Sequence, residues 1–110
     1  MIGRRRHGLW LACVAVVLAA SAAAPAYADM QLAADKGCYN CHGDPPKKKA
    51  PTFAQLAADY AKYGSDEAAL HQLADKLRSG SIFSHADAHE RLNDADALRL
   101  VRWIASGVPR

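Results

Sequence analysis

Apolar residues recur at helical spacing along the chain, which predicts a protein built from short helices. The first clear set begins after Thr52, which can cap a helix N-terminus, and ends before Gly64. Its members follow the i, i+3, i+4 and i+7 pattern of one helix face: Phe53, Leu56, Ala57 and Tyr60. The sequence therefore predicts a helix that starts at residue 53 and buries this face.

Two further sets have the same spacing. One predicted helix starts at Ser65 and stops at Gly80, and the other is capped by Asn93 and closed by Gly107 and Pro109. The apolar face of the former holds Ala69, Leu70, Leu73, Ala74 and Leu77. The apolar face of the latter holds Ala97, Leu100, Val101, Ile104 and Ala105. Acidic residues in the first turn of the last helix, Asp94 and Asp96, favour its N-terminus through the helix dipole.

The remaining segments predict one more helix and one loop. Residues 30–36 form a short Ala-rich helix candidate that Gly37 stops. Residues 43–51 hold three prolines and three consecutive lysines, which indicates an extended loop. Because no segment has convincing strand periodicity, the fold class is expected to be all-α.

The N-terminus has the pattern of an export signal. Three arginines at positions 4–6 precede an apolar stretch from Leu9 to about Ala24, and the small-x-small triplet of residues 26–28 follows. We interpret residues 1–28 as a cleaved secretory signal peptide and residues 29–110 as one domain in the periplasm. The alternative, a retained membrane anchor, requires a longer apolar stretch. Cys13 lies within the stretch and would leave with the signal.

Composition then limits the function classes. The chain has 110 residues and a formal charge of +3, but three of its 14 Lys and Arg residues lie in the signal, which leaves 11 against 11 Asp and Glu. No basic face for nucleic acid remains. Aromatic residues make up only 7% of the chain, so a small domain of this kind needs something besides its own side chains to form a core.

Two cysteines remain after the signal, in the run Cys38-Tyr39-Asn40-Cys41-His42. C-x-x-C-H is the signature of covalent haem c attachment: both thiols reach one porphyrin edge, and the next residue brings an imidazole to the iron. A thioredoxin-like thiol site needs a βαβ context, and a zinc site needs a second ligand pair. The pattern therefore predicts one haem c bound through Cys38 and Cys41, with His42 as an iron ligand.

These residues and the order of the predicted helices resemble the small mono-haem class I cytochromes c of bacteria, over nearly all of residues 29–110. The resemblance implies that short helices wrap around one haem. It also implies that the carbonyl of Pro51, in Ala50-Pro51-Thr52-Phe53, accepts a hydrogen bond from the imidazole of His42, although the glycine that usually precedes this proline is absent.

The chain departs from the family on the other side of the iron. Family members supply a methionine before the last helix, and here that loop has His85 and His89 but no methionine. Counted back from Trp103, His85 needs the smaller adjustment of loop length, and His89, so close to Asn93, is expected to have little reach. The prediction is His85 as second ligand, with His89 or no strong ligand as alternatives, and His71 as a structural residue.

Electron transfer is the function that these features favour. Two filled axial positions and no nucleophile-base or acid-base pair leave no role for a stand-alone enzyme. A gas-binding or gas-sensing haem protein with an open position is the alternative. The expected partners are redox proteins, among them a dehydrogenase or an oxidase, and a membrane is involved only if the signal stays uncleaved. Lys47, Lys48 and Lys49 are either a solvated loop or a docking site for such partners.

Overall fold

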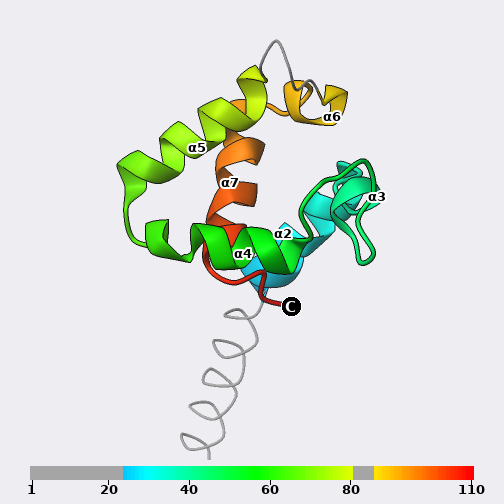
Figure 1. Cartoon of the computed structure of the whole chain (residues 1–110). Coiled ribbons are helices and arrows are strands. Elements are labelled where there is room, and N and C mark those ends of the chain that lie inside the picture. Colours follow the sequence, from blue (N-terminus) through cyan, green and yellow to red (C-terminus); the bar gives the residue numbers. More distant parts are fainter. Residues whose placement is uncertain (1–23, 81–85) are drawn as a thin grey trace, which may run out of the picture.

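The structure, a computed structural model, describes residues 24–80 and 86–110. Every regular element in these residues is a helix (Figure 1). The α-helices are α2 (Ala24–Asp35), α3 (Tyr39–His42), α4 (Phe53–Tyr60), α5 (Glu67–Ser79), α6 (Asp87–Glu90) and α7 (Asp94–Ala105), with a 3-10 turn η1 (Ala61–Tyr63). The predicted all-α fold is confirmed.

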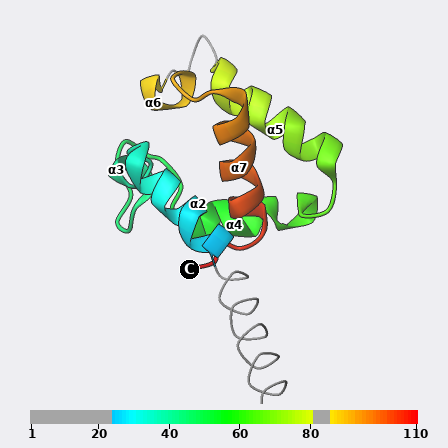
Figure 2. The ribbon, with the colours of Figure 1, turned by 180° about the vertical axis from the view of Figure 1, so that it is seen from behind.

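Helix α7 lies at the centre of the molecule and packs against α2, α4 and α5, as the two opposite views show (Figures 1 and 2). Its buried side chains are Ala97, Leu100, Val101, Trp103, Ile104 and Ala105. This set contains the whole predicted face and adds Trp103, which is 2% exposed. Trp103 also donates a hydrogen bond from Nε1 to the carbonyl oxygen of Pro109, at 3.0 Å, so the chain end is held against the core.

Local capping explains where the helices begin. The backbone N–H of Gln55 donates to Oγ1 of Thr52 at 3.1 Å, and the Thr52 N–H donates to Oε1 of Gln55 at 2.8 Å. This capping box satisfies two backbone groups at the start of α4. Asn93 caps α7 as predicted, because its Oδ1 accepts from the N–H of Asp96 at 2.8 Å.

The predicted helix start at Ser65 is two residues early, because α5 begins at Glu67. The cap is Asp66, whose Oδ1 accepts from the Ala69 N–H at 3.1 Å. Ser65 instead lies inside the turn that follows η1, which is closed by a 3.0 Å hydrogen bond from the Asp66 N–H to the Tyr63 carbonyl. Because Ser65 is within this turn, the carboxylate after it takes the cap.

Helix α2 begins earlier than the predicted residue 30. Within the described residues it runs from Ala24 to Asp35, and the alanines before residue 30 favour helix. Arg99 of α7 donates to Oδ1 of Asp29 from Nε at 3.0 Å and from Nη2 at 2.8 Å, which joins α2 to the central helix. The boundary between signal and mature chain stays a prediction.

In the described residues, no helix has both the length and the apolar content that a membrane crossing requires.

Candidate functional site

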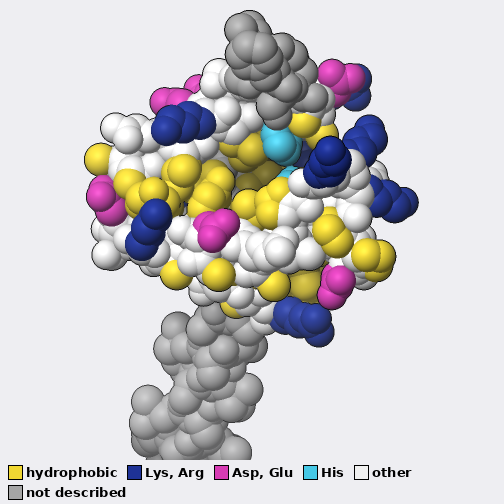
Figure 3. Space-filling model, viewed as in Figure 1, with side chains coloured by type: hydrophobic (Ala, Val, Ile, Leu, Met, Phe, Trp, Pro, Cys, Tyr) yellow, Lys and Arg dark blue, Asp and Glu magenta, His cyan; other side chains and the backbone are white. Residues whose placement is uncertain are grey.

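A cavity of about 270 Å³ opens between α3, α4, α6 and α7. Most of its wall is apolar, and the space-filling view shows a hollow with hydrophobic side chains inside it and histidine at its margin (Figure 3). The lining side chains that carry no polar group are Pro51, Phe53, Leu56, Leu77, Ala88, Leu92, Leu100, Val101 and Ile104. The polar groups in the wall are two thiols, two imidazoles and the phenol of Tyr60.

The two thiols and one imidazole come from a single turn of chain. The His42 N–H donates to the Cys38 carbonyl at 3.0 Å, so the residues from Cys38 to His42 make one helical turn. Positions i, i+3 and i+4 share one face of a helix, which turns Cys38, Cys41 and His42 toward the same cavity. Both thiols are half-buried and free, and burial raises the pKa of the Cys38 thiol.

Gly37 places this turn against the end of α2. Its φ of +75° lies in the left-handed region, and the N–H of Cys38 donates to the Ala33 carbonyl while the N–H of Gly37 donates to that of Ala34, both at 3.0 Å. This pair of bonds is a Schellman motif, for which glycine is the usual residue. The predicted helix stop at Gly37 is confirmed, and it directs the chain straight into α3.

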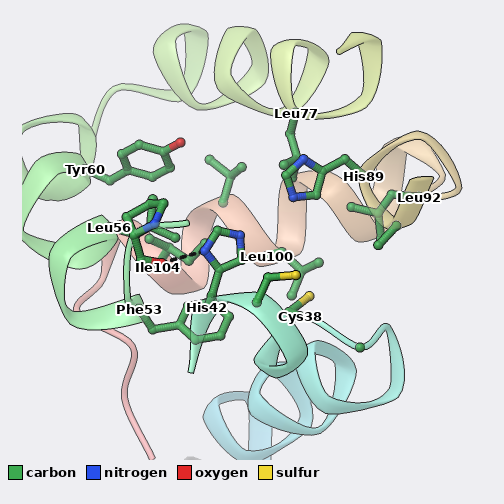
Figure 4. Close-up of a pocket in the computed structure, with 15 residues that line it drawn as sticks. Cys38, His42, Phe53, Leu56, Tyr60, Leu77, His89, Leu92, Leu100 and Ile104 are labelled. Carbon is green, nitrogen blue, oxygen red and sulfur yellow. Dashed lines mark hydrogen bonds between the residues drawn. The ribbon is translucent and has the colours of Figure 1, made fainter. Parts of the chain in front are cut away.

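The imidazole of His42 is held from two sides. Its Nδ1 lies 2.6 Å from the carbonyl oxygen of Pro51, and the ring of Phe53 lies 5.6 Å away between centroids (Figure 4). A carbonyl oxygen can only accept, so Nδ1 carries the proton of the neutral ring and Nε2 keeps its lone pair. Nε2 faces the cavity in Figure 4, in the position from which an imidazole binds a metal.

The second imidazole in the cavity belongs to His89 of α6. Its ring centroid lies 6.0 Å from that of His42, the two ring planes differ by 9°, and the rings point toward one another across the cavity (Figure 4). Burial, and then the proximity of His42, lower the pKa of His89. The expectation that His89 has little reach is therefore wrong. His85, the sequence-based candidate, lies outside the described residues.

Helix α6 is fixed by contacts that the sequence did not reveal. Arg78, near the end of α5, donates from Nε to the Leu92 carbonyl at 2.8 Å and pairs with the carboxylate of Asp94. Leu92 itself is 4% exposed. The segment between α6 and α7 is thus clamped to α5, and this clamp places His89. A cation among the final residues of a helix is common, so no sequence signal distinguished Arg78.

Met30 and His71 lie outside the cavity. Met30, half-buried on α2, lines a second cavity of about 390 Å³ together with His42, Phe53 and Trp103. His71 is exposed on α5. Neither residue lines the cavity that holds His42 and His89.

The donor set fits the haem c expected from the C-x-x-C-H run. Two thiols stand beside one imidazole at the mouth of an apolar space, as covalent attachment and iron ligation require. In residues 24–80 and 86–110, no group of three or more His, Cys, Asp or Glu side chains could hold a metal ion. A zinc site, which needs at least three such ligands, has no support in this part of the chain.

Comparison with known proteins agrees with this geometry. The cytochrome c family model matches residues 30–107. The chain is 36% identical over 83 residues to cytochrome c-552 of Hydrogenobacter thermophilus, covering 73% of this chain and 82% of that protein. It is also 36% identical over 83 residues to cytochrome c-552 of Nitrosomonas europaea, covering 72% and 78% respectively. No solved structure gives a significant match. The chain belongs to the cytochrome c family, as a small class I haem electron-transfer protein with covalently bound haem c.

Proposed function

We propose that this chain is a periplasmic one-electron carrier whose iron is bound by two imidazoles, that of His42 and that of a second histidine. The observation that carries the proposal is the pair of histidines that face one another across an apolar cavity. Haem c supplies an iron that gains or loses one electron. The residues of this chain hold the group, orient its ligands and keep its faces away from water.

Each part of the site has a role in this proposal. The thiols of Cys38 and Cys41 would hold the haem covalently, and His42 would supply the first imidazole. The Pro51 carbonyl fixes the tautomer and the orientation of that ring, which makes Nε2 a better ligand. Leu56, Leu100 and the other apolar side chains of the wall would pack against a bound haem, which would add the apolar core that the chain lacks by composition.

Two imidazoles on one iron favour electron transfer over gas binding or catalysis. A second strong ligand would occupy the position that a gas or a substrate would take. An iron that keeps the same two ligands in both oxidation states has a low reorganisation energy, which suits repeated one-electron exchange. We therefore infer a carrier and not an enzyme. The expected signal peptide at residues 1–28, most of which lies outside the described residues, supports export.

The partners are redox proteins, and one exposed surface is suited to them. Lys47, Lys48 and Lys49 are all exposed, in the loop between α3 and α4 that begins next to the haem-attachment turn. Charges placed there attract acidic surfaces over a distance of about one Debye length, roughly 8–10 Å at physiological salt. Such steering predicts that electron exchange with an acidic partner slows as salt is added.

Absorption spectra of the purified exported holoprotein test the proposal. The expected result is a low-spin spectrum in both oxidation states that carbon monoxide does not change. A high-spin spectrum with ready binding of carbon monoxide would overturn the two-imidazole carrier and support the gas-binding alternative. Colour lost on extraction with acidic acetone would contradict covalent attachment.

A further inference from the structure

We propose that His89 of α6 is the second iron ligand, opposite His42. This inference rests on the two-imidazole carrier proposed above and selects one of the two histidines that the sequence left open. Its basis is the arrangement of the His42 and His89 rings, together with the contacts that hold α6 in place.

The separation of the two rings suits a shared metal ion. An imidazole nitrogen binds a transition metal at about 2.0–2.1 Å and lies roughly 1.1 Å from its own ring centroid, so two imidazoles on opposite sides of one ion have centroids about 6.3 Å apart. The observed centroid distance between His42 and His89 is 6.0 Å. A shift of a few tenths of an ångström would complete the pair.

The tautomer of the His42 ring agrees with this arrangement. The hydrogen bond to Pro51 leaves Nε2 of His42 as the nitrogen with a free lone pair, and this nitrogen faces His89 (Figure 4). His89 approaches from the opposite wall, because it lies on α6 while His42 lies on α3. The two rings therefore meet in the cavity from elements that are far apart in the chain.

The position of His89 does not depend on a free loop. Leu92, three residues later, is buried in the core at 4% exposed, and its carbonyl accepts the hydrogen bond from Arg78. The N–H of Leu92 in turn donates to the His89 carbonyl at 3.2 Å. The backbone of His89 is thus joined to the core within one helical turn, so its ring is directed into the cavity before any group binds there.

The chain offers no thioether for this role among its described residues. Met30, the methionine of the expected mature chain, lines the second cavity with Tyr39 and Trp103. It does not line the cavity that holds His42 and His89. The sequence has no methionine in the loop before the last helix. In the structure, the imidazole of His89 lies across the cavity from His42 instead.

The test compares three alanine variants of the exported holoprotein. His89→Ala should convert the ferric haem from low spin to high spin and allow the ferrous haem to bind carbon monoxide. His71→Ala, at an exposed position on α5, is the matched control and should leave both spectra unchanged. His85→Ala tests the competing assignment. A low-spin His89→Ala protein together with a high-spin His85→Ala protein would overturn the proposal.

Two further measurements separate ligation from a merely structural role. Free imidazole added to the His89→Ala protein should restore the low-spin spectrum, which a structural defect would not allow. His89→Met should keep a low-spin iron and raise the reduction potential, since methionine ligation raises the potential of a haem. If His89→Ala yields no holoprotein, the potential of His89→Met decides, and an unchanged potential would contradict ligation by His89. A wild-type protein that is already high spin would instead refute the proposed function.

Discussion

Phe53 supports both the core and the ligand turn, so its removal should destabilise the protein strongly. The side chain is 8% exposed. Its ring centroid lies 4.9 Å from that of Tyr39, 5.6 Å from that of His42 and 5.3 Å from that of Trp103. Phe53→Ala would leave a void between α3, α4 and α7 that rigid helices cannot fill.

The structure allows the size of the effect to be worked out. Truncation of a buried Phe to Ala costs about 3–5 kcal/mol, from lost transfer free energy and the cavity left behind. Small domains are stable by only about 5–15 kcal/mol, so this one change would remove a large share of the free energy of unfolding. Phe53→Leu keeps most of the apolar volume and loses aromatic pairs worth about 0.5–1.5 kcal/mol each, so its cost should be smaller.

Equilibrium unfolding of the holoprotein in guanidinium chloride, followed by circular dichroism, measures these changes. The midpoint should fall while the slope stays constant, with Phe53→Ala below Phe53→Leu. Gln72→Ala, at an exposed position on α5, is a control that should stay within about 0.5 kcal/mol of wild type. A loss of less than about 1 kcal/mol for Phe53→Ala would refute the packing described for this ring.

The other predictions concern attachment, capping and positioning. Cys38→Ala or Cys41→Ala should lower the yield of covalent holoprotein sharply, whereas the intact protein should titrate no free thiol; a normal yield of acetone-resistant haem from either variant would contradict attachment there. Asn93→Ala should cost about 1 kcal/mol in guanidinium unfolding, because the cap of α7 is lost, and Asn93→Asp should retain most of the stability; equal losses would argue against the cap. Arg78→Met should release the segment after α6 and increase carbon monoxide binding, and unchanged binding would show that the clamp does not position His89.

Much of the fold follows from interactions between residues close in sequence. Thr52 and Asn93 cap their helices through backbone groups three residues ahead, and the apolar faces of α5 and α7 repeat at the helical period. Such contacts are set by the identity of a few neighbouring residues. The misplaced start of α5 has a different origin, because the turn that includes Ser65 depends on how η1 and Gly64 connect two helices.

In the candidate site, too, some contacts are local in sequence and others depend on the tertiary fold. C-x-x-C-H lies on one helical turn, so its thiols and imidazole share a face whatever the rest of the chain does. The contact between His42 and the Pro51 carbonyl joins residues nine apart across a proline-rich loop, and it was expected only through the resemblance to class I cytochromes c.

The position of His89 across the cavity from His42 depends on tertiary structure. Loop length favoured His85, but a count of residues measures how far a chain can extend and says nothing of its direction. The turn of helix in α6, the burial of Leu92 and the hydrogen bond from Arg78, 14 residues earlier in the chain, give His89 its direction. The choice between His85 and His89 as the second iron ligand stays a prediction. The sequence alone determined the main part of α2, α4, α5 and α7, the caps at Thr52 and Asn93, and the attachment turn, because their contacts are local. The packing of α5 against α6 brings His89 into the cavity, because this placement depends on groups far apart in the chain.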